Sequence, residues 1–349
     1  MKRPLFFIKN RKEEWSCACV KDIFLLLINM ERWQLQQLQN LPLEIKIRKT
    51  QQRIQEWYEA WNGNIHVSFS GGKDSTVLLH IARGLYPDIQ AVFADTGLEY
   101  PEIRSFVKGT EHVTWLKPKY SFKEVINKYG YPVISKEVAD AVHQYRLDLI
   151  SGKESQRAKM LKGTALDKQG RISLYDKSKW LFLVDAPFKI DAKCCYHMKK
   201  APFHRFERMT GSKCMIATMA VESRLRTTAW LKHGCNAFEA REPKSTPMSF
   251  WKEEDVLQYI RIFEVPYASI YGDIVEKELP RGKGYHLVTT GLERSGCMFC
   301  MLGVHLEKEP NRFQKMKLTH PDIYEYCMRD VELGGLGLNK VLDYIGVNY

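Results

Sequence analysis

The chain has 349 residues, 44% of them hydrophobic and 12% aromatic, which is typical of a globular protein with one large domain or two smaller ones. Its 53 lysines and arginines outnumber 41 aspartates and glutamates, and the resulting formal charge of +12 favours anionic ligands such as nucleotides or nucleic acid. No apolar run reaches the roughly 20 residues that cross a bilayer, so the composition argues against a membrane protein and predicts a cytoplasmic one.

The first 29 residues differ from the rest of the chain because they mix basic residues, Cys17, Cys19 and a short apolar run. We expect residues 1–42 to form an N-terminal extension and a helix, and translation to begin either at Met1 or at Met30. From residue 43 to residue 61 the apolar side chains recur at helical spacing, which predicts an amphipathic helix. This helix opens a predicted nucleotide-binding domain at residues 43–270.

A glycine-rich loop lies between a predicted strand at residues 65–69 and a predicted helix at residues 76–83. The loop consists of Ser70, Gly71, Gly72, Lys73, Asp74 and Ser75. Glycine lets a ligand approach the main chain closely, and the first N–H groups of the following helix have no partner within the helix. With the helix dipole, the Lys73 ammonium and the two serine hydroxyls, these groups predict a site for phosphate oxygens. The spacing is not that of a Walker A loop.

A second predicted strand, at residues 90–94, ends in Asp95, Thr96 and Gly97. A predicted helix at residues 102–108 and a strand at 112–116 follow. Strands that alternate with helices predict an α/β fold in which a parallel sheet carries helices on both faces. Ligands of such sheets bind outside the carboxyl ends of the strands, so we expect Asp95, Thr96 and Gly97 to lie beside the glycine-rich loop.

The middle of the chain is less regular. Residues 151–179 are polar and lack periodicity, which predicts a loop or lid, and strands are expected at 180–184 and 215–218. Between residues 193 and 244 eleven lysines and arginines face four acids. This basic segment fits either an anionic ligand or an ordinary solvated surface.

Beyond residue 245 the sequence predicts one clear helix and a mixed tail. Ser249 is a candidate N-cap for a helix that runs to residue 260, with acidic residues in its first turn. Residues 272–295 are rich in glycine and charge, which predicts a loop, and residues 312–349 are expected to be helical with a break at Gly334 and Gly335. We expect residues 271–349 to form a C-terminal region associated with cysteine ligands.

Four of the nine cysteines form two close pairs: Cys194 with Cys195, and Cys297 with Cys300. Four thiolates suit a tetrahedral zinc ion or a [4Fe–4S] cluster. Adjacent cysteines diverge and are awkward for one zinc ion, whereas a cubane presents separated iron corners, so the pattern favours the cluster over zinc or free thiols. The other cysteines of this half, Cys214, Cys235 and Cys327, are more typical of buried apolar positions.

The glycine-rich loop resembles the PP-loop of the ATP pyrophosphatases, which cleave ATP between the α and β phosphates and form adenylated intermediates. Residues 93–97 with Pro101 and Glu102, the paired cysteines, and residues 247–260 add further matches. Over residues 45–305 the chain resembles the phosphoadenylyl-sulfate (PAPS) reductase-like branch of the PP-loop superfamily. That resemblance implies a Rossmann-like adenine nucleotide α-hydrolase fold, and its cysteine pattern resembles that of adenylyl-sulfate reductases that contain a [4Fe–4S] cluster.

Three departures from the reductases favour ATP with Mg²⁺ as the ligand. No cysteine follows Cys327, although the reductases carry a catalytic cysteine near the C-terminus; the loop is intact, although theirs is usually eroded; and Ala220 replaces an arginine of their arginine-rich motif. In the function that we expect, the loop residues 70–75 hold the nucleotide together with Asp95, Thr96 and Gly97. Lys73, Asp74, Arg224 and Arg226 are the expected catalytic residues, and Lys199 is a further candidate to stabilise developing charge.

The expected reaction cleaves ATP to AMP and pyrophosphate and adenylates an acceptor for sulfur transfer, as in DNA phosphorothioation or RNA thiolation. Its expected partners are a nucleic acid acceptor and a sulfur donor such as a cysteine desulfurase. The first alternative is a PAPS or adenylyl-sulfate reductase that uses thioredoxin and takes its nucleophile from elsewhere, such as Cys327. The second alternative is a non-catalytic nucleotide-binding or redox-sensing subunit.

Overall fold

The computed structural model describes residues 30–280 and 284–349. The expectations about residues 1–29, including a start at Met30, concern a segment that lies almost wholly outside these described residues. Among the helices of the described part, none has the length and apolarity needed to cross a membrane.

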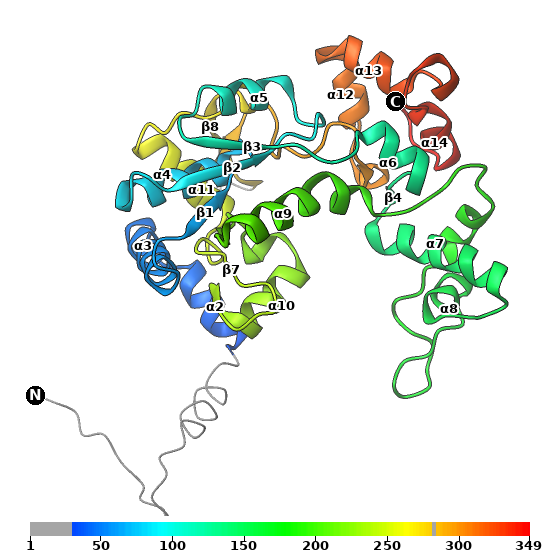
Figure 1. Ribbon diagram of the computed structural model, residues 1–349, viewed down its shortest axis with the longest axis horizontal. Helices are drawn as coiled ribbons and strands as arrows, with labels where there is room; N and C mark the ends of the chain where they lie inside the picture. The colour runs from blue at the N-terminus through cyan, green and yellow to red at the C-terminus, as the bar shows by residue number, and fades with distance from the viewer. Residues whose placement is uncertain (1–29, 281–283) are drawn as a thin grey trace, which may run out of the picture.

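A six-stranded sheet forms the centre of the molecule, and its order is β3-β2-β1-β5-β7-β6 (Figure 1). The strands are β1 (Ile65–Ser68), β2 (Gln90–Ala94), β3 (Val113–Leu116), β5 (Lys213–Met215), β6 (Asn236–Ala237) and β7 (Lys244–Ser245). All neighbours pair in parallel except β6 with β7. The predicted parallel α/β sheet is therefore confirmed, and β1 lies at its middle with the carboxyl end leading into the glycine-rich loop.

Helices cover this sheet on both faces. The helices of the sheet lobe are α2 (Arg32–Gln39), α3 (Leu43–Ala60), α4 (Lys73–Leu85), α5 (Pro101–Lys108), α9 (Ala201–Thr210), α10 (Arg224–His233) and α11 (Glu253–Ile262). Helix α4 contacts β1, α3 and α11, while α9 covers His66 of β1 with the rings of Phe203 and Phe206. Because neighbouring residues of a strand face opposite sides, His66 points to α9, and Ile65 and Val67 point to the other face.

A second lobe joins residues from two distant parts of the chain, and it lies to the right in Figure 1. Its short parallel sheet pairs β4 (Val133–Ile134) with β10 (Met301–Leu302). Its helices are α6 (Phe122–Tyr129), α7 (Lys136–Ser151), α8 (Gln156–Lys162), α12 (Arg312–Thr319), α13 (Pro321–Met328) and α14 (Leu338–Tyr344). The domain boundaries expected at residues 42 and 270 stay a prediction.

A buried ion pair fastens α3 to α11. The Lys46 ammonium, whose side chain is 2% exposed, lies 2.7 and 2.6 Å from the two carboxylate oxygens of Asp255. Asp255 also accepts the backbone N–H of Lys252 at 2.6 Å, so one carboxylate closes the first turn of α11 and neutralises the lysine. A buried lysine is tolerated only when its charge is paired in this way.

Several local expectations were wrong. Residues 180–184 belong to a 3₁₀ helix, Ser178–Asp185, because the Arg146 guanidinium binds the carbonyls of Leu183, Val184, Ala186 and Phe188 and keeps them from pairing as a strand. The expected loop at 272–295 contains an antiparallel hairpin of β8 (Ile274–Glu278) and β9 (Tyr285–Thr289), whose polar faces hid the strand pattern.

Two further expectations need correction at helix starts. Part of the expected loop at 151–179 is α8, which begins with the Ser155 hydroxyl accepting the Ala158 N–H and ends at the left-handed Gly163. The N-cap of α11 is Lys252 and not Ser249, because the Ser249 N–H donates to the Thr246 carbonyl in a preceding turn. The helical tail with its break at Gly334 is confirmed.

Candidate nucleotide-binding site

The glycine-rich loop turns from β1 into α4 as its sequence predicts. Gly71 has φ +71°, and a Cβ there would lie 2.7 Å from Val107 and 2.8 Å from Ile103 of α5. Gly72 is the N-cap of α4, and the Ser75 hydroxyl donates to its carbonyl at 2.8 Å. The Ser70 and Ser75 hydroxyls lie 3.0 Å apart. The loop is therefore held in shape by its own hydroxyls while α5 packs beneath it.

Tyr271 and Ser295 cover the loop, and neither was identified from the sequence. The Lys73 N–H donates to the Tyr271 hydroxyl at 3.4 Å, and that hydroxyl donates to Ser295 at 2.5 Å. A Cβ at Gly72 would lie 2.9 Å from the Ser295 hydroxyl. These two hydroxyls occupy the mouth of the helix N-terminus, where an anion would otherwise approach the free N–H groups.

Lys73 is buried in a cluster of charges. Its side chain is 3% exposed, and its ammonium lies 3.0 Å from Glu253, 3.5 Å from Asp74 and 2.9 Å from the Glu293 carbonyl. Burial alone would lower the pKa of Lys73, but the charges of Asp74 and Glu253 raise it above its usual value. Burial raises the pKa of Asp74, against the effect of Lys73. Glu253, at the start of α11, is a member of this cluster that the sequence did not reveal.

The two expected arginines lie in different surroundings. Both are exposed, but Arg226 pairs with Glu222 and is close enough to Asp74 for their charges to interact, whereas Arg224 forms no ion pair with any acid in the described ranges. Arg294 lies 3.5 Å from Glu222 and also acts on Asp74. Arg294 went unnoticed because it falls in a segment that was expected to be an unstructured loop.

Asp95, Thr96 and Gly97 follow β2 as predicted and form a tight turn. Gly97 has φ +72°, and the Thr96 hydroxyl donates to Glu99 at 2.7 Å. Asp95 accepts from Arg104 at 2.9 Å through one oxygen, while its other oxygen is buried without a partner in the described structure. The buried Oδ1 of Asp74 has no hydrogen bond in the described structure, but it is paired with the Lys73 ammonium at 3.5 Å. An orphaned carboxylate oxygen such as that of Asp95 fits a hard cation such as Mg²⁺.

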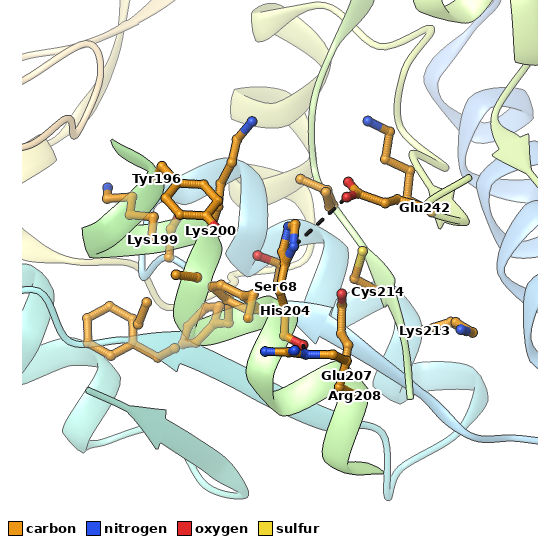
Figure 2. Close-up of a pocket in the computed structure, with 18 of the residues that line it drawn as sticks. Ser68, Tyr196, Lys199, Lys200, His204, Glu207, Arg208, Lys213, Cys214 and Glu242 are labelled. Carbon is orange, nitrogen blue, oxygen red and sulfur yellow. Dashed lines mark hydrogen bonds and ion pairs between the residues drawn. The ribbon is translucent and has the colours of Figure 1, made fainter. Parts of the chain in front are cut away.

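A cavity of about 840 Å³ opens along the sheet from the loop, between α9 and the connection before β7 (Figure 2). Ser70 is the loop residue that lines it, and Ala94 and Glu99 line it on either side of the Asp95 turn. Ser295 and Gly296 close the end near the loop. Its size is that of a small-molecule site, and it reaches the carboxyl ends of β1 and β2, where ligands of such sheets bind.

The two cysteine pairs come together beside this cavity. Cys194 and Cys195 open the helix that continues through a π-helical turn, Tyr196–Lys200, into α9, and their sulfurs lie 3.9 Å apart. Cys297 and Cys300 are tied to the Asp95 turn because the Met298 N–H donates to the Leu98 carbonyl at 2.8 Å. Lys199 lines the cavity and its ammonium also lies beside Cys297 and 3.8 Å from Glu99.

The four thiols interact with one another electrostatically. The pKa of Cys195 is lowered to about 6, since the Cys194 thiol donates to it and the ammonium groups of Lys136 and Lys199 are near. Burial raises the pKa of Cys297 to about 11. In residues 30–280 and 284–349 no group of three His, Cys, Asp or Glu side chains is arranged to hold a metal ion. The thiols are thus neighbours without the compact arrangement that a single zinc ion needs.

Replacement of either of two glycines by alanine tests the loop geometry. Gly71→Ala is expected to weaken ATP binding at least about tenfold, because alanine is strained at φ +71° and its Cβ meets α5. Gly84→Ala, in the same helix α4, meets nothing within 4 Å and is expected to keep the affinity and raise stability by about 0.5–1 kcal/mol. Calorimetric titration with ATP and thermal unfolding measure both effects. Equal ATP affinity in the two variants would show that the loop does not bind the nucleotide.

Comparison with known proteins gives the family. Residues 64–301, more than half of the chain, match the phosphoadenosine phosphosulfate reductase domain. Two uncharacterized proteins of Methanocaldococcus jannaschii are similar: one is 24% identical over 303 residues, 84% of this chain and 55% of that protein, and the other is 38% identical over 84 residues, 23% of this chain and 18% of that protein. The chain therefore spans about half the length of the first of these relatives.

Two solved structures are also similar, each with a TM-score of 0.36. PAPS reductase from Candida auris, in complex with phosphate, is 14% identical and the match covers 69% of this chain and 91% of that one. FMN adenylyltransferase from Candida glabrata is 12% identical, and the match covers 70% of this chain and 69% of that one. The domain match over residues 64–301, which contains the glycine-rich loop and reaches Cys300, shows that the chain belongs to the phosphoadenosine phosphosulfate reductase domain family.

Proposed function

We propose that the protein is an ATP pyrophosphatase that adenylates an acceptor for sulfur transfer. The observation that carries the proposal is one continuous cavity, which is lined by Ser70 of the glycine-rich loop and by Gly296 and Lys199, two residues that lie beside the cysteine pairs. A nucleotide phosphate bound at the loop and a thiol group at the cysteines would share this space. The intact loop favours a triphosphate over a sulfonucleotide.

The loop residues would hold the β and γ phosphates through backbone N–H groups at the start of α4, together with the hydroxyls of Ser70 and Ser75. Lys73, now paired with Glu253 and Asp74, would turn toward the phosphates. For the nucleotide to enter, the Tyr271 and Ser295 hydroxyls must leave the mouth of the loop or donate to phosphate oxygens themselves. Asp95, which has an unpartnered oxygen, and Asp74, once Lys73 has turned away from it, would hold Mg²⁺.

In the proposed step an oxygen of the acceptor attacks the α phosphorus. A new P–O bond forms, the bond to the β phosphate's bridging oxygen breaks, and pyrophosphate leaves with the electron pair. Positioning and positive charge provide most of the catalysis in such transfers. Arg226 and Arg294, both close to Asp74, and Lys199 on the cysteine side would stabilise the charge. Arg224, which forms no ion pair with a described acid, has less support for this role.

The cysteines would hold a [4Fe–4S] cluster, with zinc as the less favoured alternative. Four thiols are the donor set that such clusters use, and adjacent cysteines such as Cys194 and Cys195 are awkward ligands for one zinc ion. A cluster ligated by all four cysteines would supply electron-transfer chemistry or structural support at the cavity wall. A hydrosulfide from a sulfur donor would then displace AMP from the adenylated acceptor, its sulfur forming the new bond as the bond to AMP breaks. If the donor is instead the persulfide of a cysteine desulfurase, the displacement leaves an S–S bond, and a thiol reductant must then cleave it.

The reductase alternative is weakened by Cys327. This cysteine lies in α13, fully buried, and burial raises the pKa of its thiol far above neutrality. A protonated thiol without access to the cavity is a poor nucleophile. Release of sulfite from a sulfonucleotide in the presence of thioredoxin would nevertheless favour the reductase over the ATP pyrophosphatase.

The proposal is tested with ATP labelled at the α phosphate, Mg²⁺ and candidate acceptors. AMP and pyrophosphate are the expected products, and their formation should depend on the acceptor. ADP and inorganic phosphate as products would refute the proposal. Nucleotide binding without turnover in the presence of acceptor and sulfur donor would instead support a non-catalytic subunit.

A further inference from the structure

The cavity is lined by many more cations than a mononucleotide needs. Six lysines and arginines line it: Lys199, Lys200, Arg208, Lys213, Arg241 and Lys244. Lys200, the N-cap of α9, lines the cavity together with His204 and Arg208 of that helix, and the three follow one another at helical spacing (Figure 2). Arg241, which precedes β7, and Lys244, which begins it, also line the cavity. We call Lys200, Arg208, Lys213, Arg241 and Lys244 the cationic rim.

The cationic rim is not neutralised by the protein. None of its five residues forms an ion pair with an acid in residues 30–280 and 284–349. The three acids that line the cavity are half as many as its six lysines and arginines: Glu99 faces Lys199 at 3.8 Å, Glu242 lies 3.9 Å from His204, and the charge of Glu207 acts on Lys213. Five like charges around one opening repel one another, and an anion that binds there relieves the repulsion.

Two residues of the rim, Lys213 and Lys244, lie away from the phosphate loop. Lys213 pairs in register with Ile65 at the start of β1, whereas Ser70 follows the end of that strand. Five residues of extended chain separate these two positions, which is about 15 Å. Lys244 immediately precedes Ser245, the register partner of Met215, so it lies level with Cys214 and near the same end of the sheet as Lys213. Phosphates held by the loop therefore leave these cations free for other phosphates.

Aromatic side chains line the cavity together with the cations of α9. Tyr196, which is 50% exposed, and Phe203 line the cavity on the α9 side. Cations that follow a phosphate backbone, combined with aromatic rings on which bases stack, are the features that bind single-stranded nucleic acid. An acidic protein would be attracted by the rim but would gain nothing from exposed rings placed inside the cavity.

We propose that the cationic rim binds the backbone of a folded RNA and that one of its unpaired bases enters the cavity. The cavity admits a base only if it is out of the helical stack. Folded RNA offers such bases in its loops, whereas a DNA duplex must first unpair and unstack one at a cost of a few kcal/mol. The inference deepens the proposed function, because the RNA would be the acceptor, but the binding is measurable without ATP.

The test compares two triple variants by fluorescence anisotropy with a labelled RNA hairpin, its loop unpaired, and a DNA duplex of equal length. The rim variant is Lys200→Gln with Arg241→Gln and Lys244→Gln. The matched control removes the same charge from the second lobe through Lys153→Gln, Lys168→Gln and Lys179→Gln, all exposed and without ion pairs to described acids. Circular dichroism and thermal unfolding check that both variants fold.

We expect the wild-type protein to bind the hairpin at least about tenfold more tightly than the duplex. The rim variant should bind the hairpin at least about tenfold more weakly than wild type, and its affinity should depend less steeply on salt concentration. The control should stay within about twofold of wild type. Tyr196→Ala should weaken hairpin binding more than duplex binding. Three results would each overturn the inference: an equal loss of hairpin affinity in both triple variants, equal wild-type affinities for the hairpin and the duplex, or no binding of the hairpin at all. Hairpin binding without AMP formation would leave it standing while refuting the adenylation.

Discussion

Replacement of Lys46 by methionine is expected to lower the free energy of unfolding by about 3–5 kcal/mol, one of the largest effects of a single substitution in this chain. Methionine keeps most of the volume of the buried side chain but removes the ammonium that lies 2.6 and 2.7 Å from the Asp255 oxygens. The carboxylate is then left buried without its counter-charge. Chemical denaturation measures the change, with a constant m-value as the sign that the same state unfolds.

Two further variants distinguish the effect of losing the buried charge from the effect of a lysine- or arginine-to-methionine substitution in α3. Arg48→Met, an exposed position in the same helix α3, should change stability by no more than about 0.5 kcal/mol. Lys46→Met combined with Asp255→Asn should cost less than Lys46→Met alone, because the second change removes the uncompensated charge and keeps an acceptor for the Lys252 N–H. A Lys46→Met protein within about 1 kcal/mol of wild type would show that the pair is not needed for stability.

The sequence predicted the sheet because its signals are local. The run that ends at Ser70 alternates around β1, and the two glycines and the helix that follow belong to neighbouring turns of the chain. The same holds for β2 and the Asp95 turn. The strand expected near residue 180 and the loop expected near residue 274 were both wrong, because contacts between distant residues determine the structure there. Arg146 binds the carbonyls of the 3₁₀ helix, and β8 pairs with β9 to form the hairpin.

The candidate site was predicted only in part for the same reason. The residues of the loop are contiguous, but its partners come from far along the chain: Glu253 opens α11, Tyr271 ends a 3₁₀ turn, and Arg294 and Ser295 precede Cys297. No spacing rule connects them to residue 73. The proximity of the cysteine pairs was expected from the metal-binding chemistry of four thiols, whereas their place beside the cavity, next to the lining residues Lys199 and Gly296, required the fold.

Lys73 cannot bind a phosphate and keep its ion pairs with Glu253 and Asp74 at the same time. A lysine that binds phosphate must be able to leave its partners, yet Lys73 is buried with Glu253, Asp74 and the Glu293 carbonyl. If the ion pair is only structural, the loop would bind nucleotide through its N–H groups alone. If Lys73 turns toward the phosphates, Glu253 and Asp74 become free to approach a cation, and nucleotide binding loosens the segment that leads to Cys297.

Lys73→Met is expected to lower the rate of AMP formation from ATP by about 10²–10³-fold, as removal of a preorganised charge at a reacting phosphate does. It should also destabilise the protein, since Glu253 and Asp74 lose their common cation. Lys73→Met combined with Glu253→Gln separates the two effects, because glutamine removes one uncompensated carboxylate and restores part of the stability. If Lys73 acts on the phosphates, this double variant stays inactive although it is folded. Recovery of activity together with stability would instead make Lys73 a structural partner of Glu253. Production of AMP, followed with labelled ATP on protein whose folding has been checked by thermal unfolding, decides between the two.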